Sequence, residues 1–254
     1  MKIILSPAKK MNIDTDTLEC TGLPVFLEHT KEILLWLQNK SYGELQKLWG
    51  CNDKIARQNV DRLKEMNLEK NLTPAILSYE GIAYQYMVPS VFEDRQFEYI
   101  QKHLRILSGF YGVLKPMDGV VPYRLEMQAK AGIKQHKDLY DFWGNRLYQE
   151  IRDEDGILIN LASKEYSKCI EKYLSPQDTY ITCTFCEAVN GRLIQKGTYA
   201  KMARGEMVRF MADKNIKNPQ DMKYFDRLGY SYRENLSTET EYIFERVLGI
   251  TDKK

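Results

Sequence analysis

The chain has 254 residues, 43% of them hydrophobic and 28% charged, and its formal net charge is +2. These ordinary values argue against a disordered or fibrous protein, and the charge balance alone predicts no polyanionic partner. The apolar runs are a handful of residues long, as at residues 33–37, whereas a membrane helix needs roughly 18, so we expect no membrane partner. The N-terminus lacks the apolar core of a signal peptide and the five cysteines are irregularly spaced, so we expect a cytoplasmic protein with free thiols.

The first half of the chain alternates predicted strands and helices. In chain order, the pattern predicts a buried strand at 2–5, helices at 24–38 and 52–66, a short helix opened by Thr73-Pro74, and a helix at 93–107. The last of these has the clearest period, because its apolar residues recur at spacings of three and four from Phe97 to Leu107. Ser108-Gly109 follows at once and should end the helix.

The second half contains more predicted strands. In chain order, we predict a helix at 138–152, a strand at 157–161, paired strands at 179–189 and 192–199, a helix at 201–215, a short helix after Asn218-Pro219, and strands at 229–234 and 241–246. Asn190-Gly191 between the paired strands is typical of a two-residue hairpin turn. No linker-like segment or repeat interrupts this series, so we predict one domain over residues 1–254. The fold class is α/β (mixed α+β): a single compact domain with a mixed β-sheet flanked by helices.

Charge is unevenly distributed along the chain. Residues 95–137 and residues 192–223 each hold eight Lys or Arg against three Asp or Glu, whereas residues 138–155 hold two against six. If the two basic segments fold together, they form a positively charged cleft that can attract phosphates. The alternative is that these are solvated faces whose charges cancel against acidic neighbours.

Two glycines, three residues apart, follow the predicted 93–107 helix. Leu107–Val113 has the pattern Leu-x-Gly-Φ-x-Gly-Φ, where Φ is an apolar residue. This pattern looks like the hairpin of helix-hairpin-helix DNA-binding modules, in which free backbone N–H groups bind phosphate without reading sequence. The same pattern also ends helices in many unrelated folds.

Several short blocks concentrate polar side chains that suit an anion or a nucleotide. The candidates are Ser6 and Lys9 after the first strand, Tyr84, Arg124 and Glu126, Asp141, the group Asn160, Ser163 and Tyr166 near the end of the 157–161 strand, and Lys201, Arg204 and Arg209. The end of a buried strand is a common place for a site in sheet-based folds. Each residue also has an ordinary explanation, since Asn160 or Ser163 can cap a helix and Arg124 can simply pair with Glu126.

Recognised catalytic and metal-binding motifs are missing. The three histidines show no metal-ligand spacing, and Cys183 and Cys186 would point to opposite faces of a strand. No phosphate-binding loop, dinucleotide fingerprint or nucleophile elbow is present. We therefore predict no metal and no cofactor, and the sequence leaves open whether the protein is an enzyme.

Taken in order, these blocks closely resemble the YaaA family, also called DUF328 or UPF0246. The matching stretches are Ser6–Lys9, Gly81 with Tyr84, Leu104–Met127, Asp138–Gly144, Ile159–Tyr166, Tyr199–Ile216, and the C-terminal segments FDRLGYSYRE and TEYIFER. The resemblance covers nearly the whole chain. Cys169 and the 179–186 strand lie outside the family motifs, so the resemblance does not support a thiol-based peroxide sensor.

The resemblance implies a cytosolic peroxide stress protein that limits damage linked to unincorporated iron. It also implies a compact α/β domain with a positively charged cleft, a helix-hairpin-helix-like element, and binding to duplex DNA, including distorted duplexes. By motif position we assign the hairpin to Leu107–Val113, with Ser108, Gly109, Tyr111 and Gly112 as its phosphate-binding residues. We assign the cleft charge to Lys9, Arg105, Lys115, Arg124, Lys201, Arg204 and Arg209.

The sequence pattern and the family resemblance suggest three functional hypotheses. The first is DNA binding with little sequence preference, in which Phe110, Tyr111 or Tyr123 could stack on an unpaired base, Phe110 being the most probable core residue. The second is an enzyme acting on a nucleotide, nucleobase or other phosphorylated molecule. Its residues would be Ser6, Lys9, Arg124, Glu126, Asn160 and Ser163, with Lys9 and Arg124 on the anion and Glu126 or Tyr166 as acid or base. The third, iron binding, is disfavoured because no cluster of ligands has suitable spacing.

Overall fold

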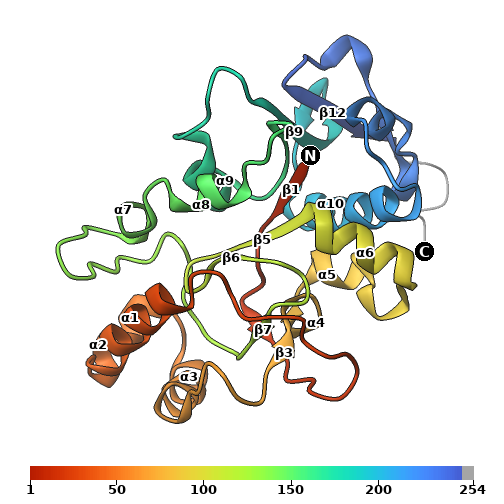
Figure 1. The fold of residues 1–254 in the computed structure, drawn as a ribbon. Coiled ribbons are helices and arrows are strands. Elements are labelled where there is room, and N and C mark those ends of the chain that lie inside the picture. Colours follow the sequence, from red (N-terminus) through yellow and green to blue (C-terminus); the bar gives the residue numbers. More distant parts are fainter. Residues whose placement is uncertain (248–254) are drawn as a thin grey trace.

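A β-sheet runs through the centre of the computed structural model, which describes residues 1–247 (Figure 1). β1 (Lys2–Leu5) lies in the middle of this sheet. It is hydrogen-bonded in parallel to β5 (Leu104–Ser108) on one side and to β8 (Ile157–Leu161) on the other. The chain segments that follow β1 and β8 therefore leave the sheet at the same edge.

The outer strands make the sheet a mixed one. Within the described residues it has eight strands, in the order β11-β12-β9-β8-β1-β5-β6, with β10 paired to β9. These outer strands are β6 (Gly112–Leu114), β9 (Thr179–Val189), β10 (Arg192–Ile194), β11 (Tyr230–Tyr232) and β12 (Glu241–Arg246). β9 and β12 continue the parallel arrangement, whereas β6, β10 and β11 are antiparallel to their neighbours. The predicted α/β fold with a mixed sheet is confirmed.

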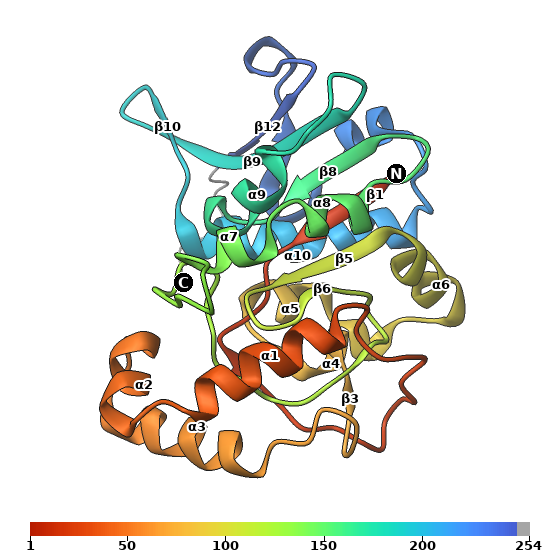
Figure 2. The ribbon, with the colours of Figure 1, turned by 60° about the vertical axis from the view of Figure 1, so that its left-hand side comes forward.

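Helices cover both faces of the sheet (Figures 1 and 2). One face carries α7 (Leu139–Trp143), α8 (Arg146–Ile151) and α9 (Lys164–Glu171), and the other carries α5 (Ile82–Met87), α6 (Asp94–His103) and α10 (Gly197–Asp213). A helical lobe at one end of the molecule consists of α1 (Leu27–Gln38), α2 (Tyr42–Trp49) and α3 (Asp53–Glu65). No helix within residues 1–247 has the length and apolar character needed to cross a membrane.

Short elements fill the space between the lobe and the sheet. β2 (Lys10–Met11) pairs with β4 (Tyr79–Glu80), and β3 (Thr73–Pro74) pairs with β7 (Gly119–Val120). The remaining elements are α4 (Ala75–Ser78) and the 3₁₀ turns η1 (Pro89–Val91), η2 (Pro219–Tyr224), η3 (Arg227–Gly229) and η4 (Glu234–Leu236).

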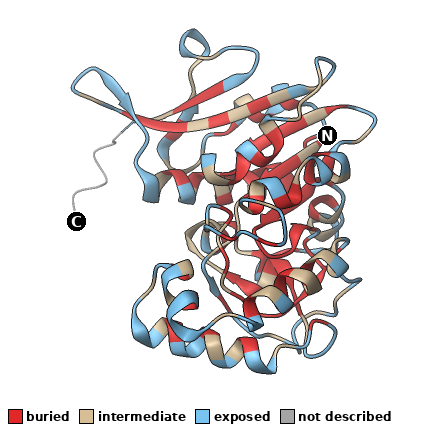
Figure 3. Ribbon diagram, turned by 90° about the vertical axis from the view of Figure 1, so that its left-hand side faces the viewer, coloured by how far each residue is buried: buried red, intermediate tan, exposed pale blue. Residues whose placement is uncertain are grey.

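The core is built on the central strands (Figure 3). Ile3, Ile4 and Leu5 of β1 are all at most 1% exposed. Strands covered on both faces contain continuous apolar runs, because neither set of alternating side chains reaches water. This burial holds β1 rigidly, so the residues that follow it are fixed in position.

The prediction of one helix over 93–107 is wrong in its last four residues. α6 ends at His103, and residues 104–108 form β5, whose five residues are all buried. A short apolar run satisfies helical and strand periods equally, and here pairing with β1 decides for the strand.

The helix-hairpin-helix assignment at Leu107–Val113 is also wrong. This segment is the tight turn of the β5–β6 hairpin, in which Leu107 pairs with Val113. The Ser108 hydroxyl accepts hydrogen bonds from the backbone N–H groups of Phe110 and Tyr111, at 3.1 and 2.9 Å. These two amide groups are buried and already bonded, so they are not available to a phosphate.

Several other boundaries differ from the prediction. The 138–152 helix is divided into α7 and α8 at Gly144, whose φ is +54°. The 192–199 strand stops at Ile194, because the chain leaves the sheet to begin α10. The Asn190-Gly191 turn is confirmed, with φ values of +51° and +74°.

Candidate functional site

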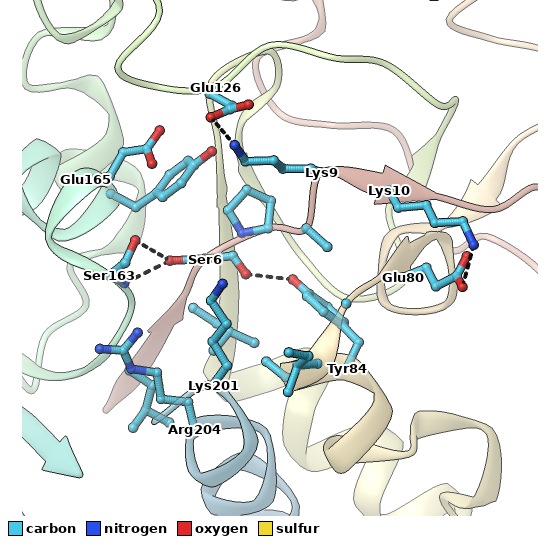
Figure 4. A pocket seen from close by; sticks show the side chains of 18 of the residues that line it. Ser6, Lys9, Lys10, Glu80, Tyr84, Glu126, Ser163, Glu165, Lys201 and Arg204 are labelled. Carbon is cyan, nitrogen blue, oxygen red and sulfur yellow. Dashed lines mark hydrogen bonds and ion pairs between the residues drawn. The ribbon is translucent and has the colours of Figure 1, made fainter. Parts of the chain in front are cut away.

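A cavity of about 390 Å³ lies where β1 and β8 end (Figure 4). Its walls include the last residues of these strands, Leu5 and Leu161, and the serines that follow them, Ser6 and Ser163. The chain runs from β1 to β5 and β6 on one side of β1 and then passes to β8 on the other side, and ligands of α/β sheets bind beside the carboxyl ends of the strands at such a reversal of strand order. We call this space the strand-end cavity.

The structure brings together nine of the residues that the sequence singled out. Ser6, Lys9, Tyr84, Arg124, Glu126, Ser163, Tyr166, Lys201 and Arg204 all line the strand-end cavity. They come from segments far apart in the chain, and the sequence alone did not show that these blocks meet at one cavity.

Two serines join the ends of β1 and β8. The backbone N–H of Ser163 donates to the Ser6 hydroxyl at 2.8 Å, and the two hydroxyl oxygens are 3.2 Å apart. The Tyr84 hydroxyl donates to the Ser6 carbonyl at 3.0 Å. Ser163 is the residue before α9, but its side chain does not cap that helix. Its hydroxyl instead lies beside Ser6 at the cavity wall (Figure 4).

Two cations hold one carboxylate at the mouth of the cavity. The Glu126 carboxylate is 2.8 Å from the Lys9 ammonium and 3.5 Å from the Arg124 guanidinium. Glu165, which belongs to the polar block after the 157–161 strand but was given no role from the sequence, also lines the cavity, and burial raises the pKa of its carboxyl above the usual value. The site therefore holds carboxyl groups in two different electrostatic environments.

Arg204 and Lys201 point toward the serine pair from α10 (Figure 4). Within residues 1–247 the Arg204 guanidinium makes no hydrogen bond or ion pair, and its Nε is buried without a partner. Burial lowers the pKa of Arg204. Lys201 is one helical turn away and exposed.

The tyrosines of the site are held in their neutral form. The Tyr123 hydroxyl lies 2.9 Å from that of Tyr79 and 2.7 Å from that of Ser108, and burial raises the pKa of Tyr123 to about 12. Burial also raises the pKa of Tyr166 far above its usual value, which argues against Tyr166 as a base. Phe110 stacks on Tyr123 and is fully buried, as expected for a core residue.

The residues assigned to the hairpin are unavailable to DNA as they lie. Ser108, Gly109, Tyr111 and Gly112 are all buried in and around the β5–β6 turn. Tyr111 is 1% exposed and its hydroxyl contacts the backbone of Val121, so it cannot stack on a base without rearrangement.

Five other predicted site residues lie outside the strand-end cavity. Arg105 is buried in β5 and donates to the carbonyls of Leu104 and Gln101, while exposed Lys115 follows β6. Arg209 is further along α10, and Asp141 accepts from the Lys137 amide. Asn160 lines a neighbouring cavity of about 420 Å³, where its side chain accepts from the Ala162 N–H and donates to Thr182. The residues predicted to line the positively charged cleft thus do not all line the same cavity.

A second cavity, of about 630 Å³, adjoins the first and shares Lys9 and Glu126 with it. Three further lysines that were not among the predicted site residues also line it, namely Lys40, Lys47 and Lys130. We call the two cavities together the shared cleft. One wall of the second cavity is the end of α2 up to Gly50, which begins the α2–α3 corner: Gly50 ends α2 with a φ of +53°, and Asn52 caps α3 through the Ile55 N–H. These are standard helix stop and start signals: the Asn52 cap agrees with the helix predicted at 52–66, whereas α2, which Gly50 ends, was not predicted.

Among residues 1–247 no group of three or more His, Cys, Asp or Glu residues is arranged to hold a metal ion. The five cysteines are free, and Cys169, Cys183 and Cys186 are buried.

The fold and the cavities define an α/β protein with a lysine- and arginine-lined site at the strand ends. A family model described as "Peroxide stress protein YaaA" matches residues 1–236. A UPF0246 protein of Agathobacter rectalis is 64% identical over 246 residues, covering 97% of this chain and 99% of the relative. UPF0246 proteins of Lachnoclostridium phytofermentans and Desulfitobacterium hafniense are each 55% identical, over 96% and 98% of this chain and 96% and 99% of their own lengths. The chain belongs to the YaaA family of peroxide stress proteins, which supports a role in the peroxide stress response.

Proposed function

We propose that the chain binds duplex or distorted DNA in the shared cleft, with little sequence preference, and so limits iron-linked damage during peroxide stress. The observation that carries this proposal is the charge of the cleft lining. Eight cationic side chains face four glutamates there. The cations are Lys9, Lys10, Lys40, Lys47, Arg124, Lys130, Lys201 and Arg204. Such an excess attracts the phosphate backbone, which is the same for every sequence.

The α2–α3 corner supports the same proposal. Gly50, which ends α2, lines the second cavity, and α3 begins three residues later behind its cap Asn52. The first backbone N–H groups of a helix lack intrahelical partners; Asn52 caps that of Ile55, and those of Asp53 and Lys54 before it suit an anion such as a DNA phosphate. This corner replaces the Leu107–Val113 turn as the proposed hairpin contact.

The shared cleft would protect DNA by covering part of its backbone. Hydroxyl radicals that iron generates from peroxide attack nearby sugars, so a protein bound along the strand shields the segment that it covers. The proposal therefore places the protective effect in the complex with DNA.

A charge-reversal pair tests the cleft. Lys47 and Lys130 are exposed residues of the second cavity, and Lys214 and Lys217 are exposed residues near the far end of α10. We expect Lys47→Glu with Lys130→Glu to weaken binding to a labelled duplex about ten-fold or more at low salt, and to reduce the slope of log K against log salt by about 2. Lys214→Glu with Lys217→Glu makes the same change in net charge and should have a much smaller effect. Fluorescence anisotropy over a salt series measures both, and equal binding by the two variants would overturn the proposal.

A second candidate function is an enzyme that acts on a phosphorylated molecule in the strand-end cavity. Five of the six residues predicted for this activity line that cavity, and only Asn160 lies outside it. Glu126 would be its acid or base, set between Lys9 and Arg124. Cells carrying Glu126→Gln should then lose peroxide resistance, whereas the exposed Glu98→Gln should keep it. Full resistance of the Glu126→Gln strain would argue against this activity.

A further inference from the structure

Arg204 lines the strand-end cavity, and no anionic group of the described residues pairs with its positive charge. Its guanidinium has neither a hydrogen bond nor an ion pair within residues 1–247, although its Nε is buried. Burial disfavours its charged form, as the lowered pKa shows. An unpaired cation removed from water costs stability, and folded proteins normally match such a charge with an anion. A bound ligand can supply that anion.

The surroundings of Arg204 suit the oxygens of a phosphate group. Lys201 lies one turn earlier on α10, and the hydroxyls of Ser6 and Ser163 stand at the same wall of the cavity (Figure 4). Guanidinium, ammonium and hydroxyl donors together bind phosphate in charge-assisted hydrogen bonds. Ser163 also directly precedes α9, where the helix favours a negative charge, and Ser6 is hydrogen-bonded to it.

The rest of the strand-end cavity is suited to a ring rather than to an ion. Tyr84, Tyr123 and Tyr166 contribute to its walls, as do the apolar residues Leu5 and Leu161. The three tyrosines are buried, so they offer a nucleobase an apolar wall to pack against rather than open ring faces, and the carboxylates of Glu126 and Glu165 can accept hydrogen bonds from a base edge. The volume of about 390 Å³ falls in the range of sites that enclose a small ligand.

We propose that the strand-end cavity binds one nucleotide unit, with its phosphate on Arg204 and Lys201 and its base against the tyrosines. The unit is either a free nucleoside monophosphate or a nucleotide that has left the stack of a DNA strand bound in the shared cleft. The second source rests on the proposed function, since it requires DNA in the cleft. Chemistry on a base, or recognition of an unpaired base, requires such extrusion from the duplex.

Calorimetric titration with 5′-AMP, adenosine and inorganic phosphate tests this inference on the full chain. We expect 5′-AMP to bind more tightly than either of its parts. Arg204→Met should weaken 5′-AMP binding by about ten-fold or more, because the charged contact is lost. It should not lower the melting temperature without ligand, because the unpaired charge has been removed. Arg209→Met is the matched control, since Arg209 is on the same helix, also has a buried Nε without a partner, and lines none of the three cavities described above.

A bulged duplex with 2-aminopurine at the bulge distinguishes the two sources. A rise in its fluorescence with the wild-type protein and not with Arg204→Met indicates a nucleotide drawn from DNA, whereas 5′-AMP binding without that rise indicates a free nucleotide. Binding of 5′-AMP by a protein that binds no DNA would remove the proposed function and leave the cavity assignment standing. Salt-dependent DNA binding that Arg204→Met leaves unchanged, together with no 5′-AMP binding, would overturn the cavity assignment alone.

Discussion

Asp118 shows how one buried carboxyl group couples this fold to pH. The residue is 6% exposed, and its carboxylate accepts the Lys115 N–H at 2.8 Å in the turn before β7. Burial raises its pKa from 3.8 to about 6, against the smaller opposing effects of that hydrogen bond and of nearby Lys115 and Arg105. The folded protein therefore binds this proton more tightly than the unfolded chain does.

We expect Asp118→Asn to stabilise the protein at neutral pH. A carboxyl group with a raised pKa contributes stability at low pH, and that contribution is lost as pH rises from 3.8 through about 6. The amide keeps an acceptor for Lys115 and removes the buried charge, so the variant should gain up to about 3 kcal/mol relative to wild type between pH 4 and pH 7. Urea unfolding across this range measures the difference, with the exposed Asp226→Asn as control. A constant difference between variant and wild type over the whole range would contradict the expectation.

At the scale of elements, the contact of α10 with α5 sets the geometry of the strand-end cavity. α10 carries Lys201 and Arg204, and α5 carries Tyr84. The two helices meet at Gly205, where a Cβ atom would overlap the backbone carbonyl of Ala83. Glycine is thus needed for this close approach, and the spacing of the helices determines how far Arg204 stands from Ser6.

Gly205→Ala should therefore be strongly destabilising, although alanine favours helix formation. Because the obstacle is backbone rather than a flexible side chain, α10 must move away from α5, and we expect a loss of at least about 3 kcal/mol. Gly197→Ala on the same helix meets no atom within 4 Å and should stay within about 1 kcal/mol of wild type. Chemical denaturation of both variants compares them, and equal stabilities would show that the helices separate at little cost.

The elements that were predicted best from the sequence are those whose ends are marked by nearby turn residues. The Asn190-Gly191 turn and the strand at 157–161 agree with β9, β10 and β8, because turn residues and flanking polar groups define their ends. β5 was missed because its identity depends on pairing with β1, about one hundred residues earlier in the chain. Periodicity within a segment carries no information about such a partner.

The sequence predicted the short polar segments that contribute to the site, but not that they meet at one cavity. Ser6 and Ser163 were selected because each follows an apolar strand, and the structure places them in hydrogen-bond contact. Arg105 was assigned to the cleft by its position in the Leu104–Met127 family motif, yet its side chain is buried against backbone carbonyls. Charge along the chain does not report which side of a strand reaches water, so only the packed structure separates the two cases.

At the scale of the whole molecule, the charge of the shared cleft comes from four separate regions. The basic segment 95–137 supplies Arg124 and Lys130, and the segment 192–223 supplies Lys201 and Arg204. The remaining cations come from the segment after β1 and from the α1–α2 region. The folding of the chain thus concentrates positive charge on one feature of a molecule whose net charge is +2.

This concentration leads to a prediction about DNA damage. If protection arises from binding in the cleft, the protein should reduce strand breaks in plasmid DNA exposed to Fe²⁺ and peroxide, and protection should fall as salt rises, because counterions compete for the phosphates. Lys47→Glu with Lys130→Glu should protect poorly, while Lys214→Glu with Lys217→Glu should protect nearly as well as wild type. Removal of iron or peroxide by the protein in free solution would instead protect equally in both variants and at all salt concentrations. Agarose gel analysis of nicked and supercoiled plasmid separates these outcomes, because shielding requires contact with the DNA and scavenging does not.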